Sequence, residues 1–366
     1  MCMLEVKEKN KRFEVLDSFR GIAAIVVAIF HYTKENGNIG QSLFISNGYR
    51  FVEFFFVLSG FIIYLNYEKI SKVPEQISFL KKRIFRLYPL HLFMLILFIL
   101  FEILKAVLYK YGVFNTKAFT TNTPLAIIPN LLLTQGIVNS SRDFTWNYPS
   151  WSISVEMINY LFFVLIIPFL GRLNRIIKPL SLLLISLLAL AISYLNVKPF
   201  EMVIKCIYCF FLGAFILIIY RKYLKNIKLS TLGINLLELL MMIIMVSCIC
   251  FLPQTYSNFL PWLYAMVILV FSFEEGFIST ALKSKFFLML GTLSYSIYMT
   301  HAMVANILKV VMVNILKLSP ALYDVTIILF LTVVLVFSYW TYNNIEMKAQ
   351  NFLRKTTLKE ISLKIK

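Results

Sequence analysis

Two residues in the first apolar segment of the chain, Arg20 and His31, have side chains that could do chemistry together. The run between them, GIAAIVVAIF, is apolar and predicts a helix. Eleven residues at about 100° each make three turns plus about 20°, so both side chains leave one helix face, roughly 16 Å apart along the axis. Asp17 lies on the same stripe. A guanidinium can hold an anion, and an imidazole can move a proton near neutral pH.

The apolar surroundings of Arg20 favour a functional role. An arginine in the middle of a membrane helix costs about 2.5–3.5 kcal/mol on insertion scales unless it is paired or reaches water. The alternative is that Arg20 extends to the cytoplasmic headgroups and that His31 only marks the far interface. These two residues alone leave both interpretations open.

A second apolar segment, RFVEFFFVLSGFIIY, places the carboxylate of Glu53 among phenylalanines. The alternative to a functional role is that Glu53 forms a local ion pair with Arg50, three residues earlier. Further along the same segment, Ser59–Gly60 would let another helix approach closely.

A basic block, KKRIFRLYPLH, stands in the predicted cytoplasmic loop that leads into the third apolar segment. The lysines of this block need no further role, because positive charge on the cytoplasmic side is enough to explain them. Arg83 and Arg86, three residues apart, make a fork suited to phosphate groups. His91, one turn further on, either packs or lines the path of such a phosphate-bearing ligand.

Two later blocks add hydroxyl and acidic groups. In WNYPSWSISVE, Ser152 and Glu156 share one helix face at the start of the fourth span. In GTLSYSIYMTH, Ser294, Tyr298 and His301 fall within about one helix face, which is unusual polarity for a membrane span.

The composition places these groups in a membrane. The chain is 60% hydrophobic with a mean hydropathy of +0.78, and long apolar runs recur from end to end. Its net charge of +18 is concentrated in alternate short loops, which indicates positive-inside orientation and not nucleic-acid binding. Cys206 and Cys209 form a CxxC inside a helical pattern, where packing explains them, so no metal site is predicted.

The predicted fold is an all-α, polytopic bundle of about ten transmembrane helices with both termini in the cytoplasm. It forms one domain, 1–366, with a core at about 14–355 and a basic cytoplasmic tail at 356–366. Residues 109–149 lie outside, and the apolar run PLAIIPNLLLTQG within them either lies in the interface or re-enters. The predicted spans are residues 16–34, 48–67, 87–108, 150–170, 178–196, 202–220, 232–252, 259–275, 286–308 and 321–342.

In this order, the blocks resemble those of the acyltransferase-3 family over about residues 14–355. LDSFRGIAAIVVAIFH resembles the family's opening motif, with its arginine and histidine about ten residues apart. Four later blocks also resemble the family's motifs in order: Glu53 before FFVLSGF, KKRIFRLYP, WSISVE with its second serine Ser154, and GTLSYSIYMTH. Met347 stands where a proline is usual, which leaves any role of Glu346 open.

The resemblance implies a bacterial multi-pass enzyme of the inner (cytoplasmic) membrane. Its members are O-acyltransferases acting on hydroxyls of polysaccharides and related glycans. The expected reaction moves an acyl group, in the simplest case acetyl, from cytoplasmic acyl-CoA to a cell-surface polysaccharide or lipid-linked glycan. Acyl-CoA is a co-substrate and no cofactor is bound permanently. Expected partners are acyl-CoA, the glycan and membrane lipid, while a homo-oligomer or a separate transferase partner is left open.

Roles for the singled-out residues follow from this chemistry. His31 is the expected base or covalent acyl carrier, oriented by Glu53 or Glu156, and Arg20 completes the catalytic set. Arg83, Arg86 and His91 are the expected donor-binding residues. The rival functions are a transporter or flippase of a glycan or polar lipid, which would also use charges within the membrane, and a structural or sensing membrane protein.

Overall fold

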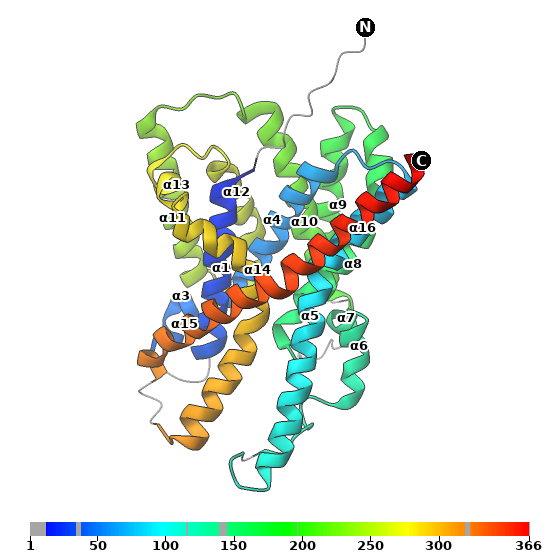
Figure 1. Cartoon of the computed structure of the whole chain (residues 1–366). Coiled ribbons are helices and arrows are strands. Elements are labelled where there is room, and N and C mark those ends of the chain that lie inside the picture. Colours follow the sequence, from blue (N-terminus) through cyan, green and yellow to red (C-terminus); the bar gives the residue numbers. More distant parts are fainter. Residues whose placement is uncertain are drawn as a thin grey trace.

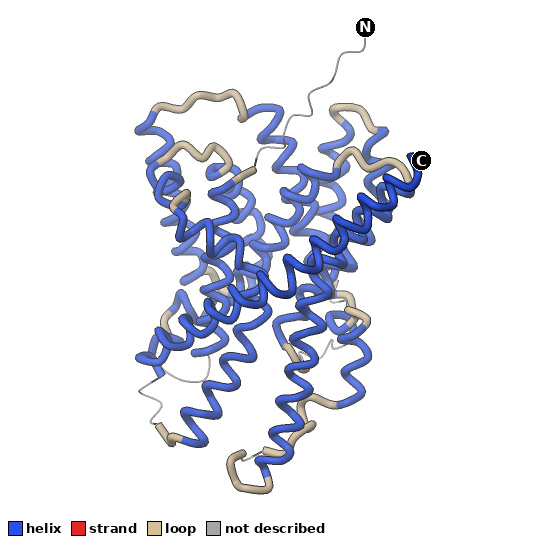
Figure 2. Tube along the Cα trace, in the orientation of Figure 1, coloured by secondary structure: helices blue, strands red, loops and turns tan. Residues whose placement is uncertain are grey.

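The computed structural model describes residues 12–33, 38–114, 116–138, 145–195, 197–318 and 323–365 of the chain. Within these residues every regular element is a helix (Figure 2). The all-α prediction is therefore confirmed for the described residues.

Each of the ten predicted spans contains a helix of the bundle (Figure 1). The long helices are α1 (Glu14–Thr33), α4 (Phe51–Tyr67), α5 (Val73–Tyr109), α8 (Trp151–Arg172), α9 (Ile177–Ser193), α10 (Glu201–Ile219), α11 (Thr231–Phe251), α12 (Leu260–Phe271), α14 (Lys285–Lys309), α15 (Tyr323–Thr341) and α16 (Met347–Ile365). The short ones are α2 (Asn38–Gln41), α3 (Leu43–Ser46), α6 (Ile127–Leu131), α7 (Gln135–Val138) and α13 (Phe277–Leu282).

Seven helices in the described residues are long and apolar enough to cross a membrane, so this is a membrane protein. They occupy Glu14–Thr33, Gly48–Tyr67, Val73–Tyr109, Tyr148–Arg172, Glu201–Leu224, Thr231–Phe251 and Asp324–Thr356. Helix α9 has 17 residues and α12 has 12, whereas α14 has 25 residues but many polar ones. The ten-span topology thus stays a prediction.

Helix α5 is longer than the sequence predicts. It begins at Val73 instead of near residue 87, with Pro74 in its first turn, where proline is tolerated, and Glu75 bonded to the backbone N–H of Lys72. The basic block is therefore helical and not a loop. The predicted tail is also helical, because α16 continues to Ile365.

Helices α1 and α14 touch backbone to backbone through two glycines. A Cβ added at Gly21 would collide with the backbone at Gly291, and a Cβ at Gly291 would collide with the Asp17 carbonyl. Because neither position has room for a side chain, the backbones of the two helices pack in direct contact.

Gly60 has the same function between α4 and α10, which confirms that a helix approaches closely at this position. A Cβ at Gly60 would collide with the Phe210 carbonyl, and one at Gly213 would collide with the Val57 carbonyl. Glycine pairs of this kind thus hold α1 on α14 and α4 on α10.

The run PLAIIPNLLLTQG forms the short helices α6 and α7 beside α5 and α8 (Figure 1). Ser154 on α8 donates to the Leu133 carbonyl at 2.7 Å and accepts from the Gly136 N–H at 3.1 Å. The start of α1 and the end of α16 lie at the same end of the bundle (Figure 1). The side of the membrane that this end faces stays a prediction.

Candidate functional site

A cavity of about 140 Å³ lies between α1, α4, α5, α8 and α14. These five helices come from distant parts of the chain, so the cavity forms only when the bundle assembles. Four charged side chains and six hydroxyl groups line it, beside apolar residues. The polar lining consists of Arg20, Ser59, Arg83, Arg86, Ser152, Glu156, Tyr160, Ser294, Tyr295 and Tyr298.

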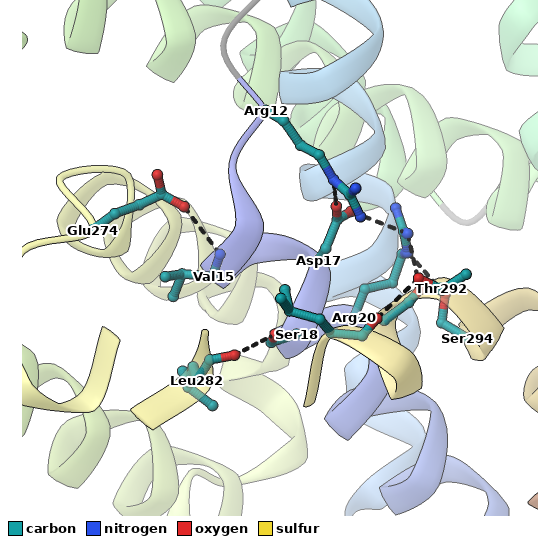
Figure 3. Close-up of polar contacts among 11 residues, drawn as sticks. Arg12, Val15, Asp17, Ser18, Arg20, Glu274, Leu282, Thr292 and Ser294 are labelled. Carbon is teal, nitrogen blue, oxygen red and sulfur yellow. Dashed lines mark hydrogen bonds and ion pairs between the residues drawn. The ribbon is translucent and has the colours of Figure 1, made fainter. Parts of the chain in front are cut away.

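Arg20, which lines this cavity, is held against α14 (Figure 3). Its Nε donates to Ser294 Oγ at 2.8 Å, and its Nη2 donates to the Gly291 carbonyl at 3.0 Å. Nη2 also lies 3.1 Å from the carboxylate of Asp17, which Arg12 contacts at 2.8 Å from the other side. Nη1 has no hydrogen-bond partner among the described residues. The guanidinium is therefore fixed in orientation with one nitrogen left for a ligand.

Arg83 and Arg86 enter the same cavity from α5. Arg83 lies over the rings of Tyr67, Phe79 and Tyr160, with centroids 5.2, 5.6 and 5.9 Å from its Cζ. Its Nη2 donates to Tyr67 Oη at 3.1 Å. Its Nε is buried without a partner in the described part of the chain.

The lining groups give the cavity an excess of positive charge. Arg20, Arg83 and Arg86 are set against one lining carboxylate, that of Glu156. Planar guanidinium groups with unused N–H donors suit phosphate or carboxylate oxygens. The arrangement can therefore hold an anion in the middle of the bundle.

Glu156 is fixed by two hydroxyl groups on the wall of the cavity. Its Oε1 accepts from Ser59 Oγ and from Tyr160 Oη, both at 2.6 Å, and those hydroxyls lie 3.1 Å apart. Tyr160 is four residues after Glu156, so its place on this face follows from helical spacing, although the sequence motifs do not single it out. Ser59, which the sequence places only in a helix contact, and Tyr295, which it does not single out, also line the cavity.

Ser152 and Tyr298 close the cavity between α8 and α14. Ser152 Oγ lies 2.8 Å from Tyr298 Oη, which donates to the Pro149 carbonyl at 3.0 Å. The ring of Tyr298 also contacts the ring of His301, with centroids 5.8 Å apart. Tyr298 thus stands between the cavity and a second group of residues further along α14.

That second group is a pair of histidines, His31 and His301, which are not among the cavity-lining residues. His31 Nδ1 lies 3.0 Å from His301 Nε2. His301 is fully buried, and its Nδ1 lies 3.1 Å from the Ile297 carbonyl. The ring of Tyr148 contacts His31 edge-on, with centroids 4.9 Å apart.

The prediction that Glu53 orients His31 is wrong. Glu53 forms an ion pair with Lys205 at 2.5 Å, and its Oε2 has no partner within the described residues. The predicted Arg50 pair does not form either. Arg50 donates instead to the Leu252 carbonyl at 3.0 Å, at the end of α11. Glu156, the other candidate, bonds to Ser59 and Tyr160 in the cavity.

His91 and Ser154 support the α6–α7 segment and do not line the cavity. His91 Nε2 lies 2.8 Å from the Asn130 carbonyl, and the side chain is 1% exposed. This position favours the packing interpretation of His91 over a place on the donor path. Ser154 bonds to the same segment at Leu133 and Gly136.

Glu346, whose role the sequence leaves open, is buried against α14 and accepts a hydrogen bond from Ser296. Thr341 donates to Ser296 at 3.2 Å, and Thr300 lies 2.9 Å from Ser338. Ser296 and Thr300, two polar residues of α14 that do not line the cavity, are therefore bonded to the last helices of the chain.

Comparison with known proteins agrees with the motifs. A family model described as an acyltransferase domain, that of acyltransferase 3, matches residues 13–342. An uncharacterized protein of Haemophilus influenzae is 26% identical over 238 residues, which cover 60% of this chain and 95% of that protein. No solved structure matches the chain. Because the family model covers most of the chain, from α1 to the end of α15, this protein belongs to the acyltransferase-3 family of membrane acyltransferases.

Proposed function

We propose that the protein transfers an acyl group, in the simplest case acetyl, from cytoplasmic acyl-CoA to a hydroxyl of a cell-surface polysaccharide or lipid-linked glycan. The observation that supports this most strongly is the gathering of Arg20, Arg83 and Arg86 around one cavity. A cluster of three cations inside a membrane bundle is costly unless an anionic ligand uses it.

Coenzyme A supplies such an anion through its phosphate groups. In the proposed complex, Arg83 and Arg86 bind donor phosphates through guanidinium contacts. Arg20, fixed by Ser294 and Gly291, adds its remaining nitrogen. The flexible pantetheine arm then extends past Tyr298 toward the histidine pair. His91 is not assigned to donor binding in this proposal.

Acyl transfer then takes place near His31. The acceptor hydroxyl oxygen attacks the thioester carbonyl carbon while the imidazole of His31 takes the hydroxyl proton. The carbon–sulfur bond breaks, and the thiolate of coenzyme A leaves and takes a proton back from the imidazolium. The ester and free coenzyme A are the products, so atoms and protons balance.

The proposed topology has ten spans in the cytoplasmic membrane with both chain ends in the cytoplasm. Positive charges follow the second, fourth and sixth predicted spans and support it. The donor then enters from the cytoplasm, and the acceptor reaches His31 from the other side. In this proposal a single domain contains both the donor site and the acceptor site at His31.

Purified protein incubated with acyl-labelled coenzyme A and isolated cell-surface glycan tests this function. An acyltransferase moves the label to the glycan as an alkali-labile ester. A transporter or flippase leaves all label on coenzyme A, which would refute the proposal. Mass spectrometry of glycans from a deletion strain and its parent then identifies the acceptor, because one set of O-acyl groups disappears.

A further inference from the structure

The contact between His31 and His301 has the geometry of a hydrogen bond between two rings, not of ring stacking. The planes are inclined by only 15°, and the centroids are 5.1 Å apart while Nδ1 and Nε2 approach to 3.0 Å. Near-coplanar rings whose nitrogens are much closer than their centres meet edge to edge. One nitrogen must therefore donate a proton and the other must accept it.

The backbone decides which of the two donates. His301 Nδ1 lies 3.1 Å from the carbonyl oxygen of Ile297, which can only accept. In neutral His301 the proton is therefore on Nδ1, and Nε2 has the lone pair. That lone pair accepts the proton on His31 Nδ1. His31 in turn has its own lone pair on Nε2.

We propose that His301 is a positioning residue that holds His31 in the tautomer able to act as a base through Nε2. The inference deepens the proposed acyl transfer and rests on it. When His31 Nε2 takes the proton of the acceptor hydroxyl, the positive charge forms on a ring already bonded to His301, which stabilises it. The same proton leaves with the thiolate of coenzyme A, and the pair returns to its starting state.

The packing of α1 on α14 fixes the relative position of the two rings. The glycine contact at Gly21 and Gly291 brings the backbones together, and Arg20 reaches Ser294 further along the same pair of helices. Within this contact His301 is fully buried with partners on both ring nitrogens. An apolar side chain would fill the space without accepting a proton.

Two unbranched substitutions of similar size test the role, His301→Gln and His301→Met. The glutamine places an amide oxygen near the position of Nε2, so it can accept from His31, whereas methionine provides only a weak acceptor. Rates are measured with labelled acetyl-CoA in membranes from cells expressing the full chain, which retain the native acceptor. Each rate is divided by the amount of folded protein.

The expected result is a difference in turnover between the two variants. His301→Met lowers kcat on the order of 10²-fold or more, which is the usual contribution of a general base. His301→Gln retains much of the kcat that the methionine variant loses. The KM for acetyl-CoA stays the same in both, because the arginine cavity is intact. In a His31→Ala background, His301→Met causes no further loss, since it acts through His31.

Other outcomes overturn the inference. The inference is refuted if His301→Met keeps wild-type turnover, or if the glutamine and methionine variants lose turnover equally. It is also refuted if His301→Met lowers turnover by its full factor in the His31→Ala background. If the methionine variant does not fold, His301→Leu takes its place in the same comparisons. Absence of label transfer by the wild-type protein would instead refute the acyltransferase proposal itself, so the two failures are distinguishable.

Discussion

The side chain of His31 is only partly buried and contributes less to packing than the fully buried His301. Replacement of His31 by alanine is therefore expected to lower acyl transfer by about 10²–10⁴-fold while expression and insertion stay normal, and to lower thermal stability only by the cost of the hydrogen bond lost at His301 Nε2. The measurement is label transfer per molecule together with the melting temperature in detergent.

His91→Ala is the matched control for this prediction. It removes a buried imidazole that bonds to Asn130 outside the cavity, so stability should fall while turnover per folded molecule is retained. Near-normal glycan acylation in His31→Ala would remove that residue from the mechanism.

The donor role of Arg83 and Arg86 can be separated from simple membrane anchoring. Lysine keeps the positive charge, but it cannot lie flat on the Tyr67 ring or offer two nitrogens to a phosphate. In the Arg83→Lys/Arg86→Lys double variant, each lost charge-assisted contact is expected to cost about 1.5–3 kcal/mol. This cost raises the KM for acyl-CoA, measured from initial rates, while insertion stays normal.

Arg175→Lys, an exposed substitution outside the cavity, should leave the KM unchanged. An unchanged donor affinity in the double variant would mean that Arg83 and Arg86 only anchor α5. The donor site would then lie elsewhere.

The sequence predicts most of the polar residues that line the cavity but few of their partners. Arg20, Glu156 and Tyr298 are recognisable because polar groups are rare in apolar spans. Their bonds cross between helices, whereas sequence spacing predicts only contacts within one helix. Glu53 illustrates this limit, because its partner Lys205 is on α10 and the nearby Arg50 turns to α11.

Among the helices, the contact of α1 with α14 has no room for an added side chain at Gly21. Gly21→Ala is expected to destabilise the protein by about 1–3 kcal/mol, because the new methyl group would overlap the Gly291 backbone. Turnover should fall as well, since the same contact sets the distance between His31 and His301. Thermal unfolding and label transfer measure the two effects.

Gly171→Ala on α8 is the control for this prediction. No atom lies within 4 Å of a Cβ at Gly171, so alanine there should be neutral or slightly stabilising through its higher helix propensity. Equal melting temperatures for the two variants would show that α1 and α14 tolerate a wider separation.

Helix α5 shows why element boundaries differ from the prediction. The sequence places its basic block in a loop because positive charge marks cytoplasmic loops in membrane proteins. Lysine and arginine are also good helix formers, and here the helix starts well before the apolar segment. Arg83 and Arg86 therefore have the fixed spacing of a helix and project into the cavity.

At the level of the whole molecule, the proposed topology predicts opposite accessibility for two loops. Cysteines introduced at Lys117 and at Lys225 should differ in their reaction with a membrane-impermeant thiol reagent in intact cells. Only the residue-117 variant is expected to react above the background of the native cysteines. After the membrane is permeabilised, both variants should react. The reverse pattern would overturn the assignment of the donor side.

The polarity of α14 has a consequence for how the protein is made. Its Ser296 bonds to Glu346 in the π-helix η8 (Tyr342–Glu346), and its Thr300 bonds to Ser338 on α15. Its Ser294 and His301 bond to α1. A helix with these groups facing lipid would be a poor substrate for independent insertion by the translocon. Stable insertion of α14 is therefore expected to require the earlier helices to be already assembled and α15 to follow. A chain released from the ribosome before residue 338 should expose this helix and be degraded.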